Sequence, residues 1–289
     1  MNKKKIIIGT AQSDPNYGII KSNNFIKIIK LIKKNKFFLD TAIVYKNSDV
    51  FFNKIGKDYD RIINKIPFIE KNEKFEKTLI QKLKKIYVHS NSKKLYGILL
   101  HDPSIILNSR YRRIILNQIR NLKNKNLLKK FGISVYSVAE LNKILKVFTP
   151  EIIQLPVNII NQSFLEKNLL RSLKKKKIEI HARSIFLQGI LLQNYENIPD
   201  YFKNKKPIKK YFEFINIKKV SPLKFCLKFL SNIKEIDKFV VGFNDLNQLR
   251  LFLNFLKKID KFKMSLKTYN NFKSTDLNLI DPRKWKKND

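Results

Sequence analysis

The sequence is poor in the residues that build disulfide frameworks, metal sites and tight turns. It has one cysteine, three histidines and seven glycines in 289 residues. The single thiol, Cys226, excludes an internal disulfide framework and is typical of a reducing compartment. His89, His101 and His181 show no ligand spacing with this cysteine, so the sequence predicts no metal site.

Long apolar runs are also absent. The basic amino terminus is followed by only three isoleucines at 6–8, whereas a secretory signal needs roughly 7–15 apolar residues. No stretch approaches the roughly 20 apolar residues that span a bilayer. Apolar residues still make up 43% of the chain, which is enough for a large core. We therefore expect a cytoplasmic protein without a membrane segment.

Acidic residues are few: 23 stand against 61 basic ones, for a net charge of +38. Such an excess points to nucleic acid or another anionic surface as a partner. However, 52 of the basic residues are lysines and nine are arginines, and arginine is the side chain that pairs with guanine and phosphate through two hydrogen bonds. The lysines also run along the whole chain. Compositional bias is thus favoured over a specific nucleic-acid site as the origin of the charge. We still expect nonspecific binding of polyanions at low salt.

Short strand-like runs alternate with amphipathic segments from end to end. The predicted strands are 4–9, 37–41, 61–66, 95–100, 130–134, 151–157, 178–183 and 237–242. The predicted helices are 22–34, 73–88, 108–127, 137–146, 162–175, 218–232 and 245–258. In 73–88, for example, apolar residues recur at spacings of three and four, which is typical of one buried helix face.

This alternation favours parallel strands, because parallel neighbours need a helix-length return connection. Eight such units close a (β/α)₈ barrel. A doubly wound open sheet is the alternative, but the G-x-G-x-x-G turn that would favour it does not follow the first strand. With no repeat, linker or break in composition, the sequence predicts one TIM-barrel domain over residues 1–289.

Glycine is so scarce that each one is expected to meet a steric need. Gly9, Gly132 and Gly242 are placed by the pattern at strand ends. Several glycines at one rim of the barrel suggest a cofactor lying across it.

Polar residues at the carboxyl ends of the predicted strands are the candidates for chemistry, since barrel active sites lie there. The four that stand out are Asp40, Tyr45, Lys65 and His101. Each alone has an ordinary explanation: an aspartate that caps a turn, a surface tyrosine, one lysine among 52, a buried histidine. As a set on three successive strands, they can converge on one point.

That convergence has a chemical use. A nearby ammonium favours the phenolate form of a tyrosine and so makes the phenol a stronger acid. Lys65 can act on Tyr45 in this way, and Asp40 can hold the lysine by a charge-assisted hydrogen bond. Tyr45 then protonates a carbonyl oxygen as hydride reaches the carbon, while His101 orients the carbonyl.

At these residues the chain resembles the aldo-keto reductase family, over nearly its whole length. The similar motifs are IGTAQ (8–12), FLDTAIVYKNSD (38–49), NKIP (64–67) and LLHDP (99–103). The resemblance implies a (β/α)₈ barrel and a catalytic tetrad of Asp40, Tyr45, Lys65 and His101, with Tyr45 as the proton donor.

The resemblance extends to the family's nicotinamide site. GISVY (132–136), IQLPVN (153–158), RSIFLQGIL (183–191) and VVGFNDLNQL (240–249) are similar to the segments that hold the cofactor. The implied cofactor-binding residues are Gly9, Thr10, Ser134, Gln154, Arg183, Ser184, Gly242, Asn244 and Gln248. The implied cofactor is NADPH, with NADH possible.

Three departures from the family pattern bear on this site. Val135 replaces an asparagine, and Arg183 stands where many members have an aromatic residue that stacks on the nicotinamide. A guanidinium can also stack on a ring. Asp245 lies where a basic residue would bind a 2′-phosphate, so the preference between the two nucleotides stays open.

The leading hypothesis is a reductase of a small aldehyde or ketone. The RSIFLQG form (183–189) resembles reductases encoded with surface-polysaccharide genes, which suggests a sugar-derived carbonyl. The alternatives are a catalytically idle barrel that serves as a cofactor-binding regulatory subunit, or one that binds polyanions. The sequence does not indicate an oligomeric state.

Overall fold

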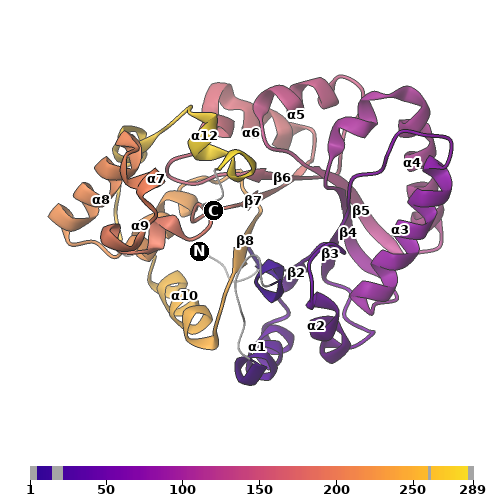
Figure 1. The fold of residues 1–289 in the computed structure, drawn as a ribbon, viewed down its shortest axis with the longest axis horizontal. Helices are drawn as coiled ribbons and strands as arrows, with labels where there is room; N and C mark the ends of the chain where they lie inside the picture. The colour runs from indigo at the N-terminus through magenta and orange to yellow at the C-terminus, as the bar shows by residue number, and fades with distance from the viewer. Residues whose placement is uncertain (1–4, 15–21, 260–261, 286–289) are drawn as a thin grey trace.

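The structure, a computed structural model, describes residues 5–14, 22–259 and 262–285. Eight parallel strands form a closed barrel in the order β1 to β8, with helices around it (Figure 1). The strands are β1 (Ile6–Gly9), β2 (Phe38–Asp40), β3 (Ile62–Ile66), β4 (Leu95–Leu100), β5 (Leu128–Ser134), β6 (Ile152–Pro156), β7 (Glu179–Arg183) and β8 (Lys238–Gly242). The predicted (β/α)₈ TIM barrel is confirmed.

The helices surround the barrel (Figure 1). They are α1 (Ser22–Asn35), α2 (Ser48–Ile55), α3 (Phe75–Ser90), α4 (Ser109–Asn124), α5 (Val138–Leu145), α6 (Leu169–Lys175), α7 (Asp200–Lys203), α8 (Lys206–Lys218), α9 (Pro222–Ser231), α10 (Leu246–Lys258), α11 (Leu266–Tyr269) and α12 (Leu277–Ile280). Of these, α3, α4 and α6 contact β3, β5 and β7, whereas α7 and α8 contact each other further out (Figure 1). None of the helices in these described ranges is long and apolar enough to cross a membrane.

Side chains from the strands fill the barrel interior in layers. Ile7, Ile63, Leu99 and Ile152 form an apolar cluster of their own, separate from the large core under the helices. Because successive side chains of a strand point to opposite faces, the residue two places further on points the same way. Lys65, His101 and Gln154 each lie two residues after a member of the cluster, namely Ile63, Leu99 and Ile152. They therefore belong to the next layer toward the carboxyl ends of the strands.

Two predicted features need correction. The helix expected over 162–175 begins only at Leu169, because Lys167 and Asn168 have left-handed φ angles of 49° and 56° that interrupt it. Gly132 lies inside β5, not at its end, and pairs with Ile152 of β6. A Cβ at this position would lie 2.2 Å from the Ile152 carbonyl oxygen, so close strand packing explains this glycine. Gly9 and Gly242 do end β1 and β8, and they pair with each other.

Five helices lie in segments where none was predicted, namely α2, α7, α8, α11 and α12. In α2, an eight-residue helix directly after the Tyr45 loop, the apolar pattern is too short to recognise. In α8, Pro207 reads as a breaker, yet it occupies the first turn, where proline is tolerated. The helix buries Tyr211, whose hydroxyl donates to the Leu191 carbonyl at 2.7 Å.

Candidate active site

A buried ion pair lies at the carboxyl ends of β2 and β3. Asp40 is 4% exposed and Lys65 is 2% exposed. The Lys65 Nζ donates to one carboxylate oxygen of Asp40, and also to the Thr41 carbonyl at 3.2 Å. Gln154 on β6 donates its Nε2 to the other Asp40 oxygen at 2.8 Å. Three strands thus hold one carboxylate, which leaves the lysine fixed at the centre of the barrel mouth.

Tyr45 lies in the loop after β2, beside this pair. Its backbone N–H donates to the Ala42 carbonyl at 3.0 Å and closes a turn. The Lys65 Nζ lies 5.9 Å from the centroid of the Tyr45 ring. The structure therefore brings the predicted acid, amine and phenol together.

His101 follows β4, and its backbone N–H donates to the Ile66 carbonyl at 2.9 Å. Burial, together with the positive charges of Lys65 and Arg183, lowers the pKa of His101 to about 4. The imidazole is therefore neutral at pH 7, so one ring nitrogen carries a proton that it can donate. Burial also lowers the pKa of Lys65, an effect that the Asp40 carboxylate opposes.

The end of β1 approaches β8 closely. Thr10 Oγ1 donates to Thr41 Oγ1 at 2.8 Å, which ties the β1 end to the Asp40 segment. The Gln12 amide packs on Gly242, where a Cβ would lie 2.0 Å from Gln12 Oε1. Among the residues that the structure describes, that oxygen has no hydrogen-bond partner, and it is buried. Gln12 was not among the predicted site residues, although its place in the IGTAQ motif was a signal for it.

Ser134 ends β5, pairs with Gln154 of β6 and is buried. At the end of β7, Arg183 reaches over toward the loop after β5: its Nη2 donates to the Val135 carbonyl at 3.0 Å, and its Nη1 to Ser184 Oγ at 3.4 Å. The Arg183 Nε is buried and finds no hydrogen-bond partner in the described part of the chain. The guanidinium carbon lies 4.0 Å from the centroid of the Tyr136 ring.

The carboxyl-terminal segment packs on the same tyrosine. The Arg283 guanidinium carbon lies 3.5 Å from the Tyr136 centroid, and Asp281 holds the guanidinium through hydrogen bonds of 3.0 Å and 2.7 Å. Burial raises the pKa of Asp281, but the hydrogen bonds from Arg283 outweigh this, so the pKa is lowered. Tyr136 lies in the GISVY segment, but neither it nor Arg283 was among the predicted site residues, because their contact joins segments that are distant in the sequence.

Asn244 and Gln248 lie exposed at the start of α10 and bind to each other. The Asn244 N–H donates to Gln248 Oε1 at 3.0 Å. The Gln248 N–H donates at 2.9 Å to Asp245, the helix N-cap. A carboxylate therefore already occupies the end of α10, where the helix dipole favours an anion.

The rim formed by these strand ends fits a nicotinamide cofactor. It offers an unpaired acceptor at Gln12 Oε1 and an unpaired donor at Arg183 Nε. Gly9 and Gly242 end the paired strands β1 and β8 at this rim. A carboxamide has both a donor and an acceptor, as these unpaired groups require.

A closed parallel barrel with a buried carboxylate–ammonium pair beside a tyrosine at the carboxyl ends of its strands has the layout of a barrel enzyme, since barrel active sites lie at that end. A family model described as "Aldo/keto reductase family" matches residues 5–266. The chain belongs to this family, and it is accordingly an NAD(P)H-dependent oxidoreductase that acts on small carbonyl compounds.

Solved structures agree in fold. An aldo-keto reductase from Bacillus halodurans, in its holo form, is similar with a TM-score of 0.71 and 12% identity, over 93% of this chain and 90% of that one. A glycerol dehydrogenase from Gluconobacter oxydans is similar with a TM-score of 0.66 and 15% identity, over 96% and 92%. No curated protein sequence matches the chain.

Proposed function

We propose that the protein reduces an aldehyde or ketone to an alcohol at the site formed by Asp40, Tyr45, Lys65 and His101. The observation that carries this proposal is the buried ammonium of Lys65, held by Asp40 and lying 5.9 Å from the Tyr45 ring centroid. A buried charge is costly unless it is paired. Buried, paired charges beside another titratable group are typical of functional sites, where they support proton transfer.

In this mechanism Tyr45 donates its phenolic proton to the carbonyl oxygen. A nicotinamide cofactor held by the rim residues would provide the hydride for the carbonyl carbon. The Lys65 ammonium stabilises the phenolate that remains. Asp40 keeps the ammonium charged, and Gln154 fixes the second carboxylate oxygen. The neutral imidazole of His101 donates a hydrogen bond to the same carbonyl oxygen and thereby orients the substrate.

For the cofactor we propose NADPH, with NADH as the alternative. Ser134, Gln154 and Arg183 would hold the nicotinamide, with Gly9, Thr10 and Ser184 beside them. Asn244 and Gln248 would meet the phosphates beyond Gly242. The Asp245 carboxylate at the α10 N-terminus opposes a 2′-phosphate there and is the feature that favours NADH.

A sugar-derived carbonyl is the proposed substrate, supported by the resemblance of the RSIFLQG segment to reductases of polysaccharide gene clusters. A cytoplasmic location is also proposed. Its support is the single cysteine, Cys226, which is free and buried.

The test compares Tyr45→Phe with wild type and with Tyr87→Phe as a control, because Tyr87 bonds the Leu127 carbonyl and is not a site residue. Fluorescence titration measures nucleotide affinity. A panel of aldehydes is then used to measure turnover. We expect unchanged nucleotide affinity and a loss of about 10²–10⁴-fold in kcat for Tyr45→Phe only. Equal turnover in all three proteins would show that Tyr45 is not the proton donor. Absence of nucleotide binding would contradict the proposal that the protein is a reductase.

The second candidate is a nucleotide-binding regulatory subunit without turnover. The observation that favours it is Arg183, which bonds the Val135 carbonyl at the point where a nicotinamide would lie. Nucleotide binding with no turnover of any aldehyde or ketone in the panel would support this candidate.

A further inference from the structure

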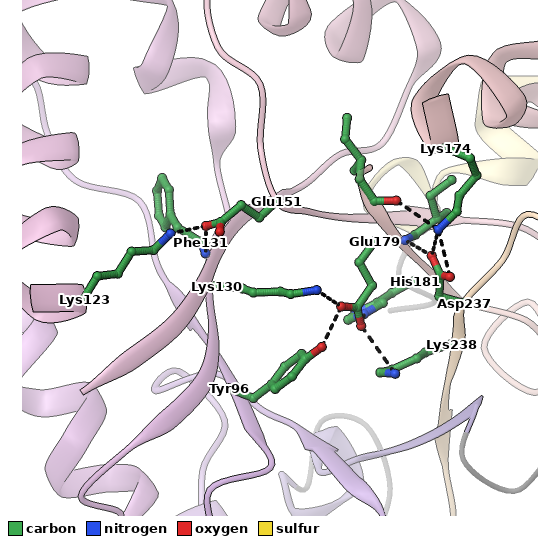
Figure 2. A network of polar contacts seen from close by, with 12 residues as sticks. Tyr96, Lys123, Lys130, Phe131, Glu151, Lys174, Glu179, His181, Asp237 and Lys238 are labelled. Atoms are coloured by element: carbon green, nitrogen blue, oxygen red, sulfur yellow. Dashed lines mark hydrogen bonds and ion pairs between the residues drawn. The ribbon is translucent and has the colours of Figure 1, made fainter. Parts of the chain in front are cut away.

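The end of the barrel opposite the active site carries a second buried polar cluster. Glu179, the first residue of β7, accepts a hydrogen bond from the Tyr96 hydroxyl at 2.6 Å and another from the Lys130 ammonium. The Lys238 Nζ lies 3.4 Å from the other carboxylate oxygen. Figure 2 shows Tyr96, Lys130 and Lys238 converging on this carboxylate from three different strands. The carboxylate is thus fully engaged inside the barrel.

A cavity of about 140 Å³ lies beside this cluster. It is lined by Phe38, Tyr96, Asp60, Arg61, Lys94 and Lys129, among others. These residues lie at or just before the first residues of their strands, so the cavity opens at the amino-terminal face of the barrel. The Phe38 and Tyr96 rings meet edge to face with centroids 4.6 Å apart and form its apolar wall.

Four cations stand over these two rings. The Arg61 guanidinium lies 5.2 Å and the Lys238 ammonium 4.6 Å from the Phe38 centroid. The Lys129 and Lys130 ammonium groups lie 5.5 Å and 5.6 Å from the Tyr96 centroid.

The cavity has more positive than negative charge. Among its lining residues, Arg61, Lys94 and Lys129 are cations and Asp60 is a carboxylate. The neighbouring cluster adds Lys130 and Lys238, both of which pair with Glu179. In the described part of the chain, Arg61, Lys94 and Lys129 form no ion pair with a carboxylate. A concave site with charge of one sign focuses its field on a small ligand of the opposite sign.

Two of these cations, Arg61 and Lys94, are each oriented by a hydrogen bond. Arg61 Nη1 donates to the Lys36 carbonyl at 3.1 Å, which fixes the plane of the guanidinium while leaving donors for a ligand. Lys94 Nζ donates to Asn126 Oδ1 at 2.7 Å. A planar guanidinium matches the oxygens of a phosphate with two parallel hydrogen bonds, and lysines add point charges.

We propose that this cavity binds a small oxyanion of the phosphate type, either free phosphate or the phosphoryl group of a small ester. The volume suits one such group, and the Phe38 and Tyr96 rings can contact the apolar part of an ester. The inference does not depend on the reaction at the other end of the barrel. It also differs from diffuse attraction to a basic protein, because it places binding at one cavity with a named arginine.

The experiment is calorimetric titration of the full chain with inorganic phosphate and with glycerol phosphate, at one ionic strength set by sodium chloride. The variants are Arg61→Gln, Lys129→Gln and their combination. The control is Lys210→Gln, which removes one exposed positive charge from α8, on the outer side of the molecule (Figure 1). Circular dichroism and thermal unfolding without phosphate establish that every variant is folded.

We expect saturable binding of at least one of the two ligands to wild type. The double variant should bind at least about tenfold more weakly, about 1.4 kcal/mol, and Lys210→Gln within about twofold of wild type. Stronger binding of the ester would identify a phosphorylated small molecule as the source, and equal binding would identify free phosphate. Absence of saturable binding, equal weakening by Lys210→Gln, or binding seen only with duplex DNA would overturn the proposal.

Discussion

Lys65 keeps an ammonium group at a position that is only 2% exposed. An unpaired charge there would be very unfavourable, since burial removes its hydration. The Asp40 carboxylate and the Thr41 carbonyl replace the lost water, and Gln154 satisfies the oxygen of Asp40 that the lysine does not use. The pair is therefore a closed network that resists rearrangement, which suits a group whose task is to hold a charge beside Tyr45.

His101 gives a prediction at the same scale. Its pKa in the folded protein is about 4, mainly because of burial, whereas the ordinary value is about 6.5. Below pH 6.5 the unfolded chain takes up a proton that the folded protein does not, so stability falls as the pH falls toward 4. We expect at most about 2 kcal/mol of loss between pH 7 and pH 5 from this residue.

Urea unfolding of wild type and His101→Gln at pH 7 and pH 5 measures this contribution. Wild type should lose more stability between the two pH values than the variant does. Identical losses would show that His101 titrates normally. The kcat/KM of wild type should likewise show no break near pH 6.5 from His101, because the imidazole stays neutral through that range.

At the scale of elements, the contact between β5 and β6 depends on one glycine. A Cβ on residue 132 would lie 2.2 Å from the Ile152 carbonyl oxygen, a backbone atom that cannot move without breaking the strand pairing. A Cβ on Gly97 of β4 would meet only side-chain atoms among its nearest neighbours, the Ile152 Cδ1 at 3.1 Å and the Ile63 Cγ1 at 3.4 Å, and a side-chain end can shift. We expect Gly132→Ala to cost at least about 2 kcal/mol of stability and Gly97→Ala less than about 1 kcal/mol.

Denaturant unfolding of both variants measures the difference. Because the two substitutions add the same methyl group inside the same barrel, their comparison isolates the backbone clash. Equal costs would mean that β5 and β6 separate easily, and that the close approach at Gly132 is not a constraint on the barrel.

The sequence predicted those elements whose signal is local. Strand β4 was predicted with its exact bounds, because its apolar run ends at the polar pair His101 and Asp102. In contrast, α8 was missed because Pro207 resembles a breaker when its neighbours in space are unknown. The start of α6 was misplaced because the left-handed turn at 167–168 is formed by Lys and Asn, which also fit a helix pattern.

The same division holds for the site. Asp40, Tyr45 and Lys65 were predicted because strand ends and motif spacing identify them, and the structure brings them together. The stack of Arg283 on Tyr136 could not be predicted, because it joins the carboxyl-terminal segment to the loop after β5. The cavity at the opposite end was likewise hidden, since its cations are ordinary residues in a chain with 52 lysines.

For the whole molecule, the net charge of +38 must act on stability. Like charges repel more strongly in the compact state than in the expanded chain, and dissolved salt screens that repulsion. Raising sodium chloride from about 20 mM to about 200 mM, which shortens the screening length by roughly threefold, should therefore stabilise the fold. An increase of about 1 kcal/mol would raise Tm by about 2–4 °C for a chain of this size.

The same charge should bind duplex DNA without sequence preference, and this binding must respond to salt in the opposite direction. Each phosphate that is neutralised releases a counterion, so affinity falls steeply as salt rises. Tm and DNA affinity measured over one salt series should therefore change in opposite senses. If Tm does not rise, the lysines are too far apart to repel each other; if DNA affinity does not fall, binding involves more than charge. Duplexes of unrelated sequence should bind equally, since compositional bias provides charge but no contacts that distinguish bases.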